Sequence, residues 1–232
     1  ASQVISAEEI HRAGATSLPE ALRLAPNLQV AQANSSQWAI SARGFNNILA
    51  NKLLVMIDGR SVYTPLYGGV FWDAQDVVLD DIDRIEVVSG PGGALWGANA
   101  VNGVINVVTR NSAQTQGLLA QAAAGSELRS LGTLRYGGEL NEDLHYRVYA
   151  KGFERDATVN VDGGNANDDW HMGQGGFRLD WQPGADLLTL QADLYQGRPN
   201  PDGTTAIDAS GGNLLGRWQR TLSASADLQL QM

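Results

Sequence analysis

Two kinds of hydrophobic pattern divide the chain. The first half contains short apolar runs rich in β-branched residues, which predict buried strands. These runs are Gln3–Ile5, Leu28–Ala31, Ala39–Ala42, Leu53–Ile57, Ile85–Val88 and Gly103–Thr109. In the second half apolar and polar residues alternate, which predicts strands with one apolar and one polar face. They are Leu118–Ala124, Leu131–Gly138, His145–Glu154, Gln174–Gln182, Leu187–Gln196, Leu214–Arg220 and Leu228–Met232.

Short helices are predicted only in the first half. Ser6 with Glu9 three residues later is a capping-box pattern, and Pro19 suits the first turn of a second helix. The glycine-rich turn Gly90–Gly93 is followed by small residues, which predict one or two helical turns within Ala94–Asn102. The glycines there are expected where the backbone turns sharply or packs closely.

A strand, a glycine turn and a helix also suggest a dinucleotide-binding unit, but the spacing argues against it. Counted from Gly90, the third glycine of the fingerprint falls on Leu95. No acidic residue that could bind a ribose lies between Glu86 and Glu127, and no phosphate-loop Gly-Lys-Ser/Thr follows.

The predicted connections in the second half differ in length. The short ones are Leu140–Asp143, Pro183–Asp186 and Ser223–Asp227, and the long polar ones are Arg155–Gly173 and Gly197–Asn213. Short turns at one end and long loops at the other are typical of outer-membrane β-barrels. Only the first hairpin, near Gly125–Ser130, departs from this habit. A soluble β-sandwich remains the alternative, although its inner faces would be richer in Val, Ile and Phe.

Composition narrows the class of protein further. The 232 residues carry a formal net charge of −9, which argues against nucleic acid as a partner. The absence of cysteine excludes disulfides and thiolate metal sites. There is neither an apolar run of eighteen residues nor a signal peptide at the start, so we expect no membrane helix and a processed or partial chain.

Four motifs, in this order, resemble the plug domain of TonB-dependent outer-membrane receptors: Ser41–Phe45, Leu54–Arg60, Asp83–Pro91 and Leu95–Asn106. The second half resembles the opening strands of the same family's barrel. The resemblance implies an α+β plug, a small mixed sheet with short helices, over residues 1–115. Residues 116–232 would then be antiparallel strands of an incomplete transmembrane β-barrel.

Size also makes us expect an incomplete barrel. A compact domain of the plug's length has a radius of gyration of roughly 13 Å, so it is about 30 Å or more across. An eight-stranded barrel encloses only side chains, whereas barrels of about 22 strands hold a plug. Seven strands therefore cannot surround this plug.

The family resemblance implies a transport receptor in the bacterial outer membrane. Such a receptor binds a scarce extracellular small molecule, most often a ferric siderophore, and TonB drives plug rearrangement to import it. The expected partners are TonB, through an upstream segment that this chain lacks, and outer-membrane lipid, with a monomeric full-length protein and no cofactor. A plug-like binding or signalling module without transport stays open as the alternative.

An enzyme finds little support in the residues. No Gly-x-Ser-x-Gly elbow is present. His11, His145 and His171 are predicted on a helix, a strand and a loop, and no pair has metal-ligand spacing. The acidic run Asp162–Asp169 departs from the EF-hand pattern and is expected to be a solvated loop.

The resemblance also implies which residues contact the ligand, namely those at the plug's outward tips. They are Asn34, Ser35, Ser36, Gln37, Trp38, Tyr63, Tyr67, Gly68, Phe71 and Trp72. Aromatic rings give large contact area at low entropy cost, although some of these rings could instead pack the loops against the sheet.

Arg43 resembles the family arginine that seats the plug against barrel carboxylates. The family's second arginine is replaced by Ser89. Arg84 and Glu86 are expected to form cross-strand ion pairs. The predicted long loops are acidic, which disfavours a strongly anionic ligand; their aspartates are Asp156, Asp162, Asp168, Asp169, Asp202 and Asp208.

Overall fold

The computed structural model describes residues 2–49, 52–64, 66, 68–97, 99–223 and 226–232. The chain divides into two compact units. The first runs to Arg110 and also includes Ala157–Asp168 and Asn200–Thr205, while the second consists of Asn111–Asp156, Asp169–Pro199 and Ala206–Met232.

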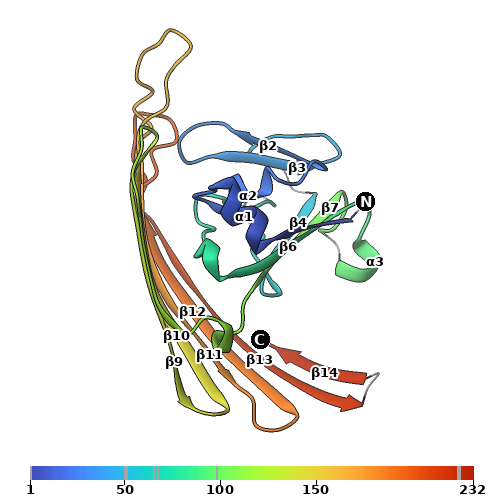
Figure 1. Cartoon of the computed structure of the whole chain (residues 1–232). Coiled ribbons are helices and arrows are strands. Elements are labelled where there is room, and N and C mark those ends of the chain that lie inside the picture. The colour runs from blue at the N-terminus through green and yellow to red at the C-terminus, as the bar shows by residue number, and fades with distance from the viewer. Residues whose placement is uncertain (1, 50–51, 65, 67, 98, 224–225) are drawn as a thin grey trace. The chain divides into compact units, whose positions relative to one another are not determined.

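The first unit contains a mixed five-stranded sheet and a separate hairpin (Figure 1). The sheet order is β1 (Ser2–Ser6), β6 (Ile82–Ser89), β7 (Gly103–Thr109), β4 (Leu53–Ile57) and β5 (Arg60–Ser61). Among the described residues of this sheet, β4 and β7 are the pair that runs in parallel, and the other ladders are antiparallel. The hairpin pairs β2 (Leu28–Gln32) with β3 (Trp38–Ala42). The α+β expectation for this unit is confirmed.

The helices are short and begin where their caps predict. α1 (Ala7–Ala13) has the full capping box of Ser6 and Glu9, and it ends at the left-handed Gly14. α2 (Leu18–Leu22) has Pro19 in its first turn. Two short 3₁₀ turns occupy Leu79–Asp81 and Ser112–Gln114. α3 (Gly93–Trp96) is about one turn long, within the one or two turns predicted, and it ends at Gly97, whose φ is 92°.

The five-stranded sheet is buried on both faces, but not along every strand. A large cluster on one face includes Ile5, Leu22 and Ile85, and a smaller cluster on the other includes Leu54 and Val104. β6 alternates, with Ile85 and Val87 fully buried and Glu86 partly exposed. The prediction that the run Ile85–Val88 is a buried strand is therefore right for one face of β6 only, since its second face carries charged residues.

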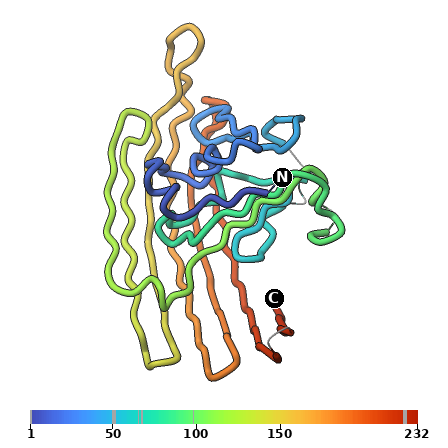
Figure 2. The backbone as a smooth tube through the Cα atoms, turned by 45° about the vertical axis from the view of Figure 1, so that its right-hand side comes forward, coloured from blue at the N-terminus to red at the C-terminus, as the bar shows by residue number. Residues whose placement is uncertain are grey.

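The second unit is a single antiparallel sheet in which neighbours in sequence are neighbours in space (Figure 2). Its strands are β8 (Gly117–Ala123), β9 (Leu128–Asn141), β10 (Leu144–Arg155), β11 (Trp170–Trp181), β12 (Asp186–Gly197), β13 (Ala209–Ser223) and β14 (Ala226–Gln231). Within the described residues the edge strands β8 and β14 do not pair with each other, so the sheet is not closed. His171 lies in β11 and not in a loop, because that strand starts earlier than its apolar alternation.

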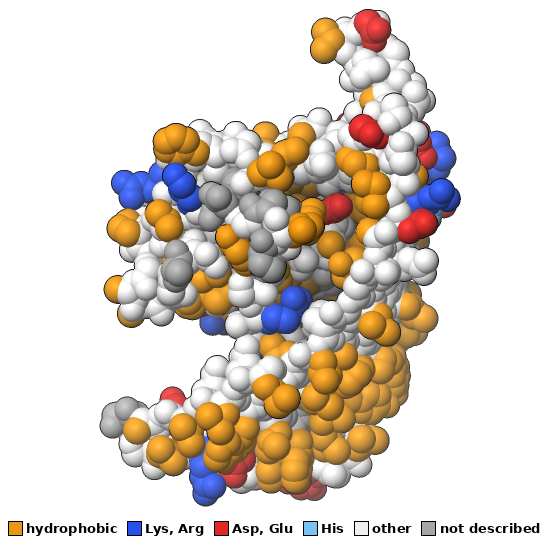
Figure 3. Space-filling model, turned by 180° about the vertical axis from the view of Figure 1, so that it is seen from behind, with side chains coloured by type: hydrophobic (Ala, Val, Ile, Leu, Met, Phe, Trp, Pro, Cys, Tyr) orange, Lys and Arg blue, Asp and Glu red, His pale blue; other side chains and the backbone are white. Residues whose placement is uncertain are grey.

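In this sheet many apolar side chains are exposed and many polar side chains are buried, which is the reverse of the pattern in a soluble protein. Leu134, Leu190 and Leu194 are 55%, 42% and 70% exposed. Polar neighbours on the other face, among them Arg135 and Thr189, are buried. Figure 3 shows hydrophobic side chains gathered over one face of these strands. An apolar outward face and a polar inward face are what a membrane barrel requires, and they are contrary to the sandwich alternative.

No helix within the described ranges is long and apolar enough to cross a membrane.

Candidate functional site

The tip of the β2–β3 hairpin is a tight turn organised by Asn34. The Asn34 Oδ1 atom accepts the N–H groups of Ser36 at 3.0 Å and Gln37 at 2.7 Å. Its amide nitrogen donates to Gln37 Oε1 at 2.9 Å, and the N–H of Ala33 donates to the carbonyl of Gln37. An asparagine side chain that accepts a hydrogen bond from the backbone N–H two residues ahead stabilises such a turn by itself, without support from a long helix or strand.

Two distant segments of the same unit bind this turn. Ser35 donates its N–H to Asp168 Oδ2 at 2.8 Å and its hydroxyl to the Asp168 carbonyl. Asn34 Nδ2 donates to the carbonyl of Pro201 at 2.8 Å. Ser35 and Ser36 are 2% and 1% exposed. The structure thus places these predicted ligand residues together at the turn, but their polar groups are engaged within the protein.

Asp168 is the acceptor at the centre of these contacts. Its carboxylate also accepts the N–H of Thr158 at 2.7 Å and the Thr158 hydroxyl at 2.8 Å. Burial alone would raise the pKa of Asp168, but the hydrogen bonds from Ser35 and Thr158 outweigh burial and hold that pKa below its usual range. The expectation of a solvated acidic loop was wrong for Asp168, which is only 2% exposed.

The segments 157–168 and 200–205 also bind each other. Asn200 Nδ2 donates to the carbonyl of Asn167 at 2.5 Å. Gly203, at φ 69°, approaches the Ala166 carbonyl so closely that a Cβ there would clash with it. We call the hairpin tip Ala33–Gln37 together with these two segments the tip cluster. The sequence carried no signal for it, since Ser35 and Asp168 are 133 residues apart and no local pattern links them.

The predicted aromatic residues separate into buried and exposed ones. Trp38 and Trp72 are 6% and 7% exposed and belong to the main hydrophobic core, and the Arg23 guanidinium lies 4.9 Å from the Trp38 ring centre. Phe71 is 40% exposed and Tyr63 is half-buried. These positions favour Phe71 and Tyr63 as ligand contacts, although the ligand role of every residue in this set stays a prediction.

Two further predicted ligand positions, Tyr67 and Gly68, follow β5 in the sequence. Tyr67 lies outside the described residues. Gly68 has a left-handed φ of 74° and donates its N–H to the Thr64 carbonyl at 3.1 Å. Gly68 therefore serves a turn, and a side chain at that position would strain the backbone.

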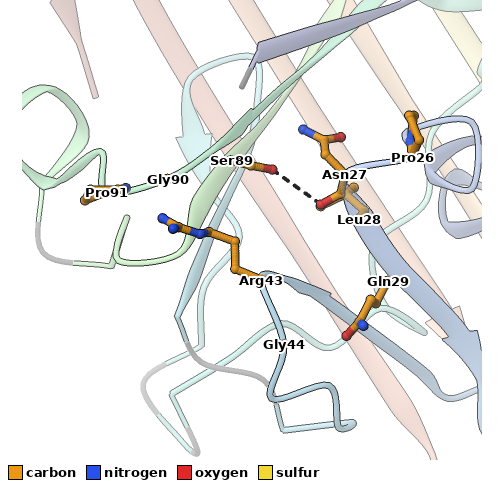
Figure 4. A pocket seen from close by; sticks show the side chains of 9 residues that line it. All are labelled: Pro26, Asn27, Leu28, Gln29, Arg43, Gly44, Ser89, Gly90 and Pro91. Atoms are coloured by element: carbon orange, nitrogen blue, oxygen red, sulfur yellow. Dashed lines mark hydrogen bonds between the residues drawn. The ribbon is translucent and has the colours of Figure 1, made fainter.

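Arg43 lies in an open pocket of about 620 Å³ (Figure 4). The pocket is lined by Pro26, Asn27, Leu28, Gln29, Arg43, Gly44, Ser89, Gly90 and Pro91. Figure 4 shows the Arg43 side chain extending toward Gly90, and a Cβ built on Gly90 would lie 3.9 Å from Arg43 Nη1. Within the part of the chain that the structure describes, the Asn27 side-chain amide has no hydrogen-bond partner. A cation beside an amide is suited to receive a carboxylate.

The backbone at Arg43 is strained. Arg43, Gly44 and Phe45 have φ values of 62°, 91° and 57°, so three successive residues are left-handed. For a residue with a Cβ this conformation costs about 1–2 kcal/mol. Strain of this kind persists at functional positions, and the Arg43 side chain is exposed.

Arg84 and Glu86 are paired, but not across strands as expected. Arg84 Nε donates to Glu86 Oε1 at 2.7 Å within β6, because residues two apart in a strand share a face. Arg84 also binds Asp83. The cross-strand partner of Glu86 is Asn106 on β7, whose hydrogen bond, followed by that of Arg84, lowers the pKa of Glu86 against the effect of burial.

Metal-site geometry is not found in the described residues, where no three His, Cys, Asp or Glu side chains could together hold an ion. His11 lies 4.0 Å from Asp80 and His145 lies 3.9 Å from Glu139, each beside a single carboxylate.

Comparison with known proteins gives one family. The family model of the TonB-dependent receptor plug domain matches residues 1–104. The vitamin B12 transporter BtuB of Vibrio vulnificus (strain CMCP6) is 37% identical over 126 residues, which cover 53% of this chain and 20% of BtuB. The ferric enterobactin receptor of Pseudomonas aeruginosa (strain PAO1) is 29% identical over 195 residues, covering 74% of this chain and 24% of the receptor.

A solved structure has the same fold. The P. aeruginosa FpvA structure with a bound heterologous pyoverdine superposes with a TM-score of 0.78 at 15% identity, covering 100% of this chain and 33% of FpvA. This chain spans about a fifth to a quarter of the length of the two curated relatives.

Proposed function

Because the chain belongs to the TonB-dependent receptors of the bacterial outer membrane, we propose that it acts in the uptake of a scarce extracellular nutrient. The ligand binds on the outside, and TonB then rearranges the plug so that the ligand passes. No covalent bond is made or broken in this process. Energy coupling requires a TonB contact, which we assign to a segment upstream of β1.

The observation that best supports transport is the order of the two kinds of structure along the chain. A compact α+β unit precedes an antiparallel sheet with one exposed apolar face and one polar face. A binding module alone would have no need of strands suited to a membrane, whereas a transporter needs a wall around its plug.

We propose a ferric siderophore as the ligand and vitamin B12 as the second candidate. The named relatives include a vitamin B12 transporter and a ferric enterobactin receptor. The acidic loops weigh less against an anionic siderophore than the sequence alone indicated. Asp168 is occupied in the tip cluster, Asp156 pairs with Arg129 at 3.0 Å, and Asp208 lies 3.6 Å from Arg198.

Arg43 would seat the plug in such a receptor. Its exposed guanidinium lies in a pocket that suits a carboxylate, and a carboxylate from the surrounding wall would complete the pair. Phe71 and Tyr63 would contact the ligand. We propose both the carboxylate partner of Arg43 and the ligand contacts of Phe71 and Tyr63.

Uptake in cells tests the function directly. A strain that lacks the gene and the same strain carrying it on a plasmid are compared for uptake of radiolabelled ferric siderophores and of labelled vitamin B12. Transport predicts uptake that depends on the gene and disappears in a strain without TonB. Ligand binding at the cell surface without any TonB-dependent uptake would instead favour the binding or signalling module.

A further inference from the structure

We propose that Asp168 is the latch of the tip cluster: it holds the plug's outward turn and both long loops together, and this latch must open before the ligand passes. The inference rests on the proposed uptake function for its second half. Its first half concerns only the protein and can be tested without any ligand.

The latch depends on one carboxylate that serves two segments. Asp168 Oδ2 accepts the N–H of Ser35 from the hairpin and the hydroxyl of Thr158 from the loop base. Asp168 Oδ1 accepts the N–H of Thr158. Because one buried carboxylate accepts hydrogen bonds from both segments, its removal takes this acceptor away from the Ser35 N–H and from Thr158 at the same time.

The same residue closes the base of its loop. Thr158 follows the end of β10 by three residues, and Asp168 precedes the start of β11 by two. The N–H of Ala166 donates to the Thr158 carbonyl at 2.9 Å. The second loop is attached through the bond from Asn200 to the Asn167 carbonyl. A change at Asp168 is therefore transmitted to the hairpin and to the loops before β11 and β13.

The closed cluster withholds the predicted ligand-contact groups. Ser35 and Ser36 are almost fully buried, and the Asn34 amide is used on both its oxygen and its nitrogen. A ligand that binds this turn must replace those contacts. The contacts are hydrogen bonds between polar groups and not an apolar core, so water and ligand groups can replace them reversibly.

Hydrogen exchange in the full-length protein tests the latch without ligand. Asp168→Ala is expected to raise the exchange rates of the Ser35 and Thr158 amides together, by tenfold or more, while amides in the centre of β3 keep their protection. The matched control is Asp162→Asn, an exposed aspartate in the same loop, which should leave both rates unchanged. Unchanged rates for Ser35 and Thr158 in Asp168→Ala would overturn the latch.

A reversible lock tests whether the latch must open. The chain contains no cysteine, so Ser35→Cys with Asp168→Cys introduces the only two thiols in this part of the receptor. These thiols are joined by a short thiol-reactive linker with a cleavable disulfide. Joining is expected to lower uptake at least tenfold, and reduction to restore it, with each single-cysteine variant treated identically to measure effects of the reagent.

The outcomes of the lock experiment separate the two proposals. Equal uptake by the joined and the reduced receptor would overturn the opening requirement. A parent receptor that takes up no ligand would overturn the proposed function and, with it, the opening step, while the exchange experiment still decides whether Asp168 is the latch.

Discussion

Ser112 donates both its N–H and its hydroxyl to the same oxygen of Asp180, each at 2.8 Å. Arg178 Nε donates to that oxygen as well, and Thr189 donates its hydroxyl to the other at 2.7 Å. All four residues are buried. Ser112 begins the 3₁₀ turn Ser112–Gln114, two residues after Arg110, so this carboxylate fixes that turn to β11.

Asp180→Ala is therefore expected to be strongly destabilising. It removes a charged partner of the buried Arg178 and the acceptor for Ser112, and removing one partner of a buried ion pair typically costs about 3–5 kcal/mol. The measurement is the free energy of unfolding of the full-length protein in detergent, followed by circular dichroism. Asp227→Ala, at an exposed position in β14, is the control and should change little. Equal stability of the two variants would contradict the role of Asp180.

Arg43→Gly should have opposite effects in the two contexts. In the 232-residue chain, glycine relieves the left-handed strain at φ 62° and is expected to raise stability by about 1 kcal/mol. In the full-length receptor the same change removes the proposed seating charge and should loosen the plug. Denaturant unfolding of the chain and protease sensitivity of the receptor's plug are the two measurements. Loss of stability in the chain would show that Arg43 has a partner there.

Gly103 and Gly93 form a matched pair for the sheet. A Cβ at Gly103 would lie 2.5 Å from the Val88 carbonyl, so Gly103→Ala must push β7 away from β6. The expected cost is about 1–3 kcal/mol. At Gly93 a Cβ meets nothing within 4 Å, and alanine is a better helix former, so Gly93→Ala should not destabilise. Thermal unfolding of both variants checks this, and similar melting temperatures would contradict it.

Trp72 and Phe71 are neighbours with different expected roles. Trp72→Ala removes a core side chain and should cost about 3–5 kcal/mol of stability. Phe71→Ala should leave stability within about 1 kcal/mol and weaken ligand binding. Unfolding and equilibrium binding of the full-length protein are measured for both. A Phe71→Ala receptor with unchanged affinity would remove Phe71 from the ligand contacts.

The tip cluster should be insensitive to mild acid. Because the pKa of Asp168 is held below its usual value of about 4, the stability it contributes is fully present above that value and is lost only as the pH falls through the lowered pKa. The protection of the Ser35 amide, corrected for intrinsic exchange, should stay constant down to about pH 4 and then fall. In Asp168→Asn this fall should disappear, and a loss already near pH 6 would contradict the assignment.

The patterns that predicted the fold correctly are local. Ser6 and Glu9 lie three residues apart and form the expected cap, and the alternation of Phe177 with Arg178 gives the exposed and buried faces of β11. Strand ends were less accurate. β11 begins at Trp170 and β13 at Ala209, well before their apolar alternation, because glycines and polar residues continue both ladders.

The candidate site could be predicted only in part. The asparagine and serines of the hairpin turn were recognised by their resemblance to the family, but the contacts that bury them come from residues more than a hundred positions away. From the sequence, Trp38 and Trp72 were both predicted to be aromatic residues at the tips of loops. Only the tertiary packing shows that both belong to the core. The left-handed backbone at Arg43 and Phe45 likewise could not be predicted, because arginine and phenylalanine normally avoid that conformation.

The position of β1 has a mechanical consequence. β1 is an edge strand joined to the sheet by a single ladder, from Ser2 opposite Val88 to Ser6 opposite Arg84. β7, in contrast, is held by neighbours on both sides. Tension applied to the amino terminus therefore loads the β1–β6 ladder first, and β1 can peel from β6 while the β6–β7–β4 centre stays intact.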